Sequence, residues 1–80
     1  MTVDVLLFAS YADALGARSV RVTVPDDACV DDVVRAVRAL APGVPLPARP
    51  LVAVNHRYAR GDQAVRSSDE LALFPPVAGG

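Results

Sequence analysis

The sequence predicts a small α+β domain, with one main helix packed on one face of a mixed sheet of four to five strands. Three observations support this prediction: strand-like apolar segments near both ends of the chain, one amphipathic helical stripe between them, and a length of 80 residues. That length suits a single domain, residues 1–80, with a core near the lower limit for folding without disulfides or metals. A composition of 52% hydrophobic and 21% charged residues indicates a globular chain.

The N-terminal part of the chain is typical of two strands joined by a short helical turn. Residues 3–10 are β-branched and apolar, and their odd-numbered side chains, including Ala9, form the expected core face. The other face is also apolar in its second half, as in a central strand. A short helix-compatible stretch, 11–15, is stopped by Gly16, and residues 19–24 then alternate between inward valines and outward polar side chains. The two strands are therefore predicted to form a hairpin.

The main helix is predicted from apolar residues spaced at i, i+3, i+4, i+7 and i+10. These residues are Val30, Val33, Val34, Val37 and Leu40. Cys29 falls at the expected N-cap, where a helix N-terminus can lower the pKa of a thiol. A reactive Cys29 and a small residue tolerated at a helix start are both open interpretations, and the second is favoured. Pro42 and Gly43 end the helix.

The second half of the chain completes the sheet. Residues 41–50 hold four prolines and form a stiff, extended connector. Two short strands, 51–54 and 57–60, flank a turn at 55–56, and residues 70–74 form the last strand. With the first and last strands side by side in the middle, this order is that of a β-grasp (ubiquitin-like) domain.

Composition excludes several classes of function. A net charge of −1 gives no basic surface for nucleic acid or for an anionic membrane. The chain has neither an apolar run long enough to span a membrane nor the positively charged start of a signal peptide, and its one cysteine suits a reducing compartment. We therefore expect a cytoplasmic protein. A single histidine, His56, and a single cysteine, Cys29, do not assemble a metal cluster or a Cys/His pair by local spacing, so no bound metal is expected.

The C-terminal residues carry the most functional information. Pro75 and Pro76 have a fixed φ and no N–H, so they end the sheet and begin a stiff stalk. Residues 75–80 are expected to form a flexible tail. Because Gly79 and Gly80 lack a Cβ atom, the terminal carboxylate can enter a narrow channel that would reject a side chain. The Gly80 carboxylate is thus the predicted reactive group.

A binding surface is predicted beside this tail. If the helix covers one face of the sheet, the even-numbered side chains of the first strand, Leu6 and Phe8, point the other way. They would lie next to Phe74, and Tyr58 would extend the patch. An exposed apolar patch of this kind usually marks an interface. The predicted partner-binding residues are Phe8, Tyr58, Phe74, Pro75 and Pro76, and the alternative is that both phenylalanines belong to the core.

Three stretches resemble a known family: residues 3–9 followed by Leu15-Gly16, residues 51–55, and residues 70–80. The chain is similar to the small, sulfur-carrying subunits of molybdopterin synthase in the MoaD/ThiS group of β-grasp proteins. The last stretch is the most specific, since a phenylalanine, two prolines, a short spacer and two terminal glycines are close to a signature of that group. The proline-rich segment 41–50 and Ser67-Ser68 before Asp69 depart from the family pattern.

The resemblance implies a two-stage cycle. An E1-like adenylating enzyme activates the Gly80 carboxylate with ATP, and a sulfurtransferase supplies the sulfur that converts it into a thiocarboxylate. The tail then enters the large subunit of molybdopterin synthase, which transfers the sulfur to a cyclic pyranopterin monophosphate. The resemblance also implies that the chain itself binds no cofactor and is not catalytic alone.

Alternatives of other classes stay open. The chain could be a protein modifier whose Gly80 is conjugated to lysines of target proteins. It has no lysine of its own, which argues only against polymers of itself. It could also carry sulfur for thiazole, cysteine or a secondary metabolite, or be a non-covalent ubiquitin-like module. The fold alone does not separate these functions.

Overall fold

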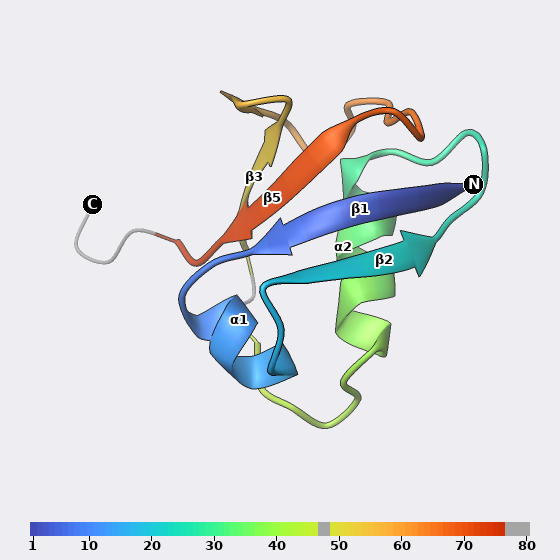
Figure 1. Cartoon of the computed structure of the whole chain (residues 1–80). Helices are drawn as coiled ribbons and strands as arrows, with labels where there is room; N and C mark the ends of the chain where they lie inside the picture. Colours follow the sequence, from blue (N-terminus) through green and yellow to red (C-terminus); the bar gives the residue numbers. More distant parts are fainter. Residues whose placement is uncertain (47–48, 77–80) are drawn as a thin grey trace.

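The computed structural model describes residues 1–46 and 49–76; residues 47–48 and 77–80 lie outside the described part. A five-stranded sheet carries one long helix on one face and a short helix at one end (Figure 1). The elements are β1 (Thr2–Leu7), α1 (Ser10–Leu15), β2 (Ser19–Thr23), α2 (Val30–Ala39), β3 (Leu51–Val54), β4 (Arg57–Tyr58) and β5 (Glu70–Phe74).

The strands lie in the order β2-β1-β5-β3-β4. β1 and β5 run parallel, while the β1–β2, β3–β5 and β3–β4 pairs are antiparallel. The first and last strands therefore occupy the middle of the sheet, as predicted, which explains why both are so apolar. This topology confirms the predicted β-grasp fold. Because β1 and β5 are parallel and in register, both end at the same edge of the sheet, near α1 (Figure 1).

The core lies between α2 and the sheet. Three valines of the predicted helical stripe, Val30, Val33 and Val37, are fully buried there. Asp31 and Asp32 occupy the first turn of α2, where the helix dipole favours negative charge. The buried residues from the strands and loops that complete the core are Val3, Val5, Leu7, Tyr11, Val22, Val24, Ala28, Val52, Val54, Val65, Leu71 and Leu73.

Two residues predicted to face this core do not. Leu40, the last member of the helical stripe, is 51% exposed, because α2 ends at Ala39 and Leu40 is only its C-cap. Ala9 is also exposed, because β1 ends at Leu7 and the chain turns at Ala9, with φ of 51°, to begin α1. The predicted first strand, 3–10, therefore continued three residues beyond Leu7, where β1 ends.

The segment between β4 and β5 has no regular periodicity, yet it caps the start of α2. The carbonyl oxygen of Gln63 accepts the Val30 N–H at 2.9 Å, and that of Gly61 accepts the Asp31 N–H at 2.9 Å. These N–H groups have no partner within the helix itself. Val65, from the same segment, is buried in the core. The segment therefore fixes α2 against the sheet.

Candidate functional site

The face of the sheet opposite α2 carries an exposed apolar surface. Side chains alternate along a strand, so the residues between the buried positions of β1, β3 and β5 point away from the helix. We call the resulting patch the aromatic surface; it consists of Leu6, Phe8, Ala53, Tyr58, Ala72 and Phe74. Together with His56 and Glu70 at the rim, these residues line a shallow hollow of about 320 Å³.

The three aromatic rings form one cluster. The Phe8 and Phe74 rings are stacked, with centroids 4.5 Å apart and planes 11° apart. The Tyr58 ring meets Phe74 edge-on, with centroids 6.5 Å apart. Phe8 is nevertheless 41% exposed and Tyr58 75% exposed. Neither phenylalanine belongs to the buried core, which contradicts the alternative that both are core residues.

Backbone register explains why the two phenylalanines meet. Leu7 of β1 is opposite Leu73 of β5, so the next residues along these parallel strands are neighbours. The Phe8 N–H extends this pairing by donating to the Leu73 carbonyl oxygen at 3.1 Å. The sequence-based prediction that Phe8 and Phe74 lie side by side on the open face is thus correct.

Small side chains form the floor of the hollow. Ala53 and Ala72 are directly opposite each other in the β3–β5 pair, and Leu6 is opposite Ala72 in the β1–β5 pair. Because alanine is short, the flanking rings rise above the floor and leave a depression. Neither alanine was predicted for this surface, although each lies between buried positions of its strand and so points to the open face.

The rim at the far end of the hollow is polar. His56 Nε2 lies 3.7 Å from Glu70 Oε1, and both side chains are largely exposed. Asn55 fixes the neighbouring turn: its Nδ2 donates to Asp69 Oδ1 at 2.9 Å, and its Oδ1 accepts the Glu70 N–H at 3.0 Å. The aromatic surface is therefore bounded by a hydrogen-bonded hairpin.

The stalk of the tail starts at this surface. Pro75 follows Phe74 directly and is half-buried, while Pro76 is exposed. The prolines lack the N–H that would extend β5 along its neighbours. The predicted reactive residues, Gly79 and Gly80, lie outside the described residues.

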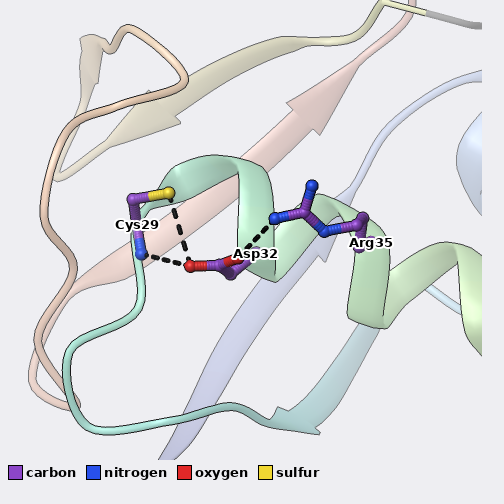
Figure 2. Close-up of polar contacts among 3 residues, drawn as sticks. All are labelled: Cys29, Asp32 and Arg35. Carbon is purple, nitrogen blue, oxygen red and sulfur yellow. Dashed lines mark hydrogen bonds and ion pairs between the residues drawn. The ribbon is translucent and has the colours of Figure 1, made fainter.

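Cys29 has a structural contact rather than an exposed reactive position. Its backbone N–H donates to Asp32 Oδ2 at 3.0 Å, and its Sγ lies 3.4 Å from the same oxygen (Figure 2). Arg35 pairs with the other carboxylate oxygen. The Cys29 N–H, then the Arg35 guanidinium and the Cys29 thiol, lower the pKa of the Asp32 carboxyl. This arrangement caps the N-terminus of α2, which agrees with the favoured interpretation of Cys29.

Two further properties concern residues 1–46 and 49–76. None of the helices in this part of the chain is long and apolar enough to cross a membrane. Within the same residues, no three His, Cys, Asp or Glu side chains gather in a group that could hold a metal ion.

The strand order and the single long helix define a protein of the ubiquitin-like β-grasp class. Within that class the chain belongs to the ThiS family, whose model matches residues 5–80. The match includes the end of β1, the aromatic surface and the whole C-terminal segment.

Individual relatives support this assignment. The chain is 32% identical to a molybdopterin synthase sulfur carrier subunit from Dictyostelium discoideum, over 95% of this chain and 93% of that protein. It is 39% identical to small archaeal modifier protein 1 from Haloferax volcanii, over 92% of this chain and 95% of that protein. A crystal structure of the Haloferax volcanii modifier superposes with a TM-score of 0.82 at 36% identity, and the match covers all of both chains.

Proposed function

We propose that this chain is a sulfur carrier that serves as the small subunit of molybdopterin synthase in molybdenum cofactor biosynthesis. Its Gly80 carboxylate is adenylated and converted into a thiocarboxylate, which then gives up its sulfur. The observation that carries the proposal is the C-terminal sequence, residues 74–80, which starts on β5 beside the aromatic surface and ends in Gly79-Gly80. Relatives named sulfur carrier subunits in Dictyostelium discoideum and Homo sapiens, each 32% identical, support it.

The chemistry needs an activated carboxyl group, because a carboxylate anion resists nucleophiles. A Gly80 oxygen bonds to the α-phosphorus of ATP and pyrophosphate leaves, giving an acyl-adenylate. A sulfur donor then attacks the carbonyl carbon and AMP leaves. This chain supplies a terminus free of side chains, while its partners supply the orientation and the acid–base groups.

The aromatic surface gives both partners a place to bind. An activating enzyme and a large synthase subunit must each hold the domain while the tail occupies their active site. Aromatic residues at the centre of an exposed apolar patch are the usual anchors of such interfaces. Phe8, Tyr58 and Phe74, with Pro75 and Pro76 leading to the tail, are therefore proposed as the partner-binding residues.

A second candidate function is protein modification, in which Gly80 is joined to lysines of other proteins. The identity of 39% to the Haloferax volcanii modifier favours it as the alternative. The two functions share adenylation of Gly80 and differ in what attacks the activated carbonyl. A sulfur carrier for thiazole, cysteine or a secondary metabolite would differ only in the final acceptor.

One experiment separates these functions. The chain is incubated with ATP, the activating enzyme of the source organism and sulfide, and its intact mass is measured. The proposal predicts replacement of one oxygen by sulfur, and loss of that sulfur on adding the large synthase subunit and cyclic pyranopterin monophosphate. Retention of the sulfur, with molybdopterin absent, would rule out the synthase assignment. Covalent adducts to lysines of added proteins would favour the modifier.

A further inference from the structure

The outer edge of β2 presents backbone groups that β1 does not use. β2 lies at one end of the strand order, and no other strand of residues 1–46 and 49–76 pairs with its outer side (Figure 1). The Val24 N–H donates to the Met1 carbonyl oxygen at 2.9 Å. At the other end of β2, the Leu7 N–H donates to the Arg18 carbonyl oxygen at 2.8 Å. Bonded and unbonded positions alternate in an antiparallel pair, so residues 18, 20, 22 and 24 turn their N–H and C=O groups toward β1. The groups that point outward are those of Ser19, Arg21 and Thr23.

The side chains of this edge continue the aromatic surface. Ser19, Arg21 and Thr23 are all exposed, and Ser19 is directly opposite Leu6 of the aromatic surface. Arg21 is opposite Asp4, and its Nε donates to Asp4 Oδ1 at 2.8 Å. A guanidinium carries five N–H donors, so this bond leaves the terminal NH2 groups of Arg21 able to hold a second carboxylate. A protein that covers Leu6 is therefore placed beside Arg21 and the edge of β2.

Charge decides which kind of strand fits this edge. If the whole of β2 paired with β2 of a second copy, Arg21 would be directly opposite Arg21 of that copy. Like charges directly opposite each other destabilise a strand pair. An acidic residue at that position would instead place a carboxylate beside the guanidinium, on the side away from Asp4. The edge therefore favours a partner strand with a carboxylate opposite Arg21 over a second copy of this chain.

The size of the aromatic surface indicates which partner would use the edge. The aromatic surface has six residues, whereas a standard interface takes about 20–30 residues from each protein. Subunits of one enzyme bury more surface than proteins that meet briefly, such as an enzyme and the carrier that it activates and releases. The chain is 32% identical to proteins named synthase subunits. The large synthase subunit is thus the partner that most needs contacts beyond the aromatic surface.

We propose that an extended segment of the large synthase subunit pairs with β2 and adds a strand to the sheet, with an acidic side chain opposite Arg21. The backbone groups of Ser19, Arg21 and Thr23 supply the hydrogen bonds, and the carboxylate fixes the register of the added strand. The inference rests on the proposed function, because it takes the large synthase subunit as a partner. It adds a second contact that does not depend on the aromatic rings.

Hydrogen exchange of individual amides tests for the added strand. The exchange of the labelled chain is followed by NMR, alone and with an excess of the large synthase subunit of the source organism. We expect the Ser19, Arg21 and Thr23 amides to exchange at least about tenfold more slowly in the complex, because each gains a hydrogen bond. The Val20 and Val22 amides already donate to β1 and should change little, so they are controls within the same strand.

Two pairs of variants test the backbone and the charge separately. Thr23→Pro removes one outward N–H at an edge position, where proline is tolerated, and Thr23→Ala is its control. We expect Thr23→Pro to bind the large subunit about tenfold more weakly than Thr23→Ala, because a hydrogen bond is lost. Arg21→Gln should weaken binding about threefold. Arg49→Gln, which removes the same charge from an exposed arginine outside β2 and the aromatic surface, should not.

Binding of the large subunit without slower exchange at Ser19, Arg21 and Thr23 would overturn the proposal, even if Thr23→Pro does not fold. Equal slowing at Val20 and Val22 would overturn it as well, since that pattern reports general stiffening of the strand. So would protection by the activating enzyme alone. A parent chain that the large subunit does not bind refutes the proposed function instead, so the two failures are distinguishable.

Discussion

At the scale of single residues, the exposed aromatic rings keep apolar surface that their own fold leaves in water and that a partner can bury. Phe8 already stacks on Phe74, yet it leaves 41% of its surface in contact with water. Fully burying a phenylalanine side chain is worth about 1.5–3 kcal/mol, and part of that stabilisation is unused in the free protein. A binding partner can provide the rest.

Replacing Phe74 or Phe8 by alanine should therefore weaken binding more than it lowers stability. We expect each change to cost about 1–4 kcal/mol of binding to the activating enzyme and the large synthase subunit, as for an interface hot spot. Titration calorimetry and a thermal melting curve measure the two effects side by side. The control is Leu40→Ala, an exposed apolar residue outside the aromatic surface, which should leave affinity unchanged. Unchanged affinity of the phenylalanine variants with a large loss of stability would refute the interface.

A second prediction at this scale concerns Asp32 and pH. Its folded pKa is below the ordinary value of about 4, so its carboxylate stabilises the fold above that pH and ceases to do so as pH falls through the folded pKa. Asp32→Asn should thus be less stable than the parent at neutral pH, and the difference should disappear in acid. Urea unfolding at a series of pH values tests this expectation. Asp27→Asn, in the exposed turn before α2, is the control for the loss of one charge. A difference that is the same at all pH values would contradict the prediction.

At the scale of elements, the β3–β4 hairpin positions Tyr58 in the aromatic surface. Val54 pairs with Arg57, so the loop has two residues, Asn55 and His56, and both have positive φ, 53° and 71°. This is the geometry of a type I′ turn, for which Asn-Gly is the preferred sequence. His56 is therefore in a conformation that glycine adopts more easily.

His56→Gly should stabilise the protein by about 0.5–1 kcal/mol, because the strain at positive φ is relieved. The exposed contact with Glu70, at 3.7 Å, should contribute little to offset this gain. Asn55→Gly is the matched comparison and should destabilise, since it removes the hydrogen bonds to Asp69 and to the Glu70 N–H. Chemical denaturation measures both changes. A less stable His56→Gly variant would show that the histidine side chain makes stabilising contacts that outweigh the strain at positive φ.

Elements with clear periodicity were predicted well from the sequence. The short apolar runs at 51–54 and 70–74 gave β3 and β5 with their observed bounds, and the valine stripe gave α2. Positions at the ends of elements were predicted less well. Leu40 matches the helical spacing but lies beyond the last turn, and Ala9 follows the strand pattern but begins a turn. Spacing alone does not show where the hydrogen bonds stop.

The candidate site was predicted only where the pairing of regular strands fixes the position of a residue. Phe8 and Phe74 could be placed together because parallel pairing of two central strands fixes their relative position. The segment between β4 and β5 could not be placed from the sequence, since it has no regular periodicity. The packing of that loop on α2, through the carbonyl oxygens of Gly61 and Gln63, depends on tertiary contacts.

At the scale of the whole molecule, the proposed function assigns separate tasks to the folded domain and to the terminus at Gly80. The buried core lies between α2 and the sheet, within residues 3–73. The aromatic surface occupies the opposite face, and Pro75 leads away from its edge. The domain thus offers the surface that a partner would recognise. The glycines, which lack a Cβ atom, are proposed to enter that partner's active site. Folding of the domain is not expected to depend on the two terminal glycines.

The most direct test of this separation compares the parent chain with a variant that lacks Gly79 and Gly80. Each protein is incubated with ATP, the activating enzyme and sulfide, and its intact mass and thermal midpoint are measured. We predict that the parent gains a sulfur in place of one oxygen. The shortened chain should keep its original mass and melt within a few degrees of the parent, since a loss below about 0.5 kcal/mol shifts the midpoint of a domain of this size only slightly. A collapse of the thermal midpoint on removal of the two glycines, or sulfur incorporation without them, would contradict the assignment of Gly80 as the reactive terminus.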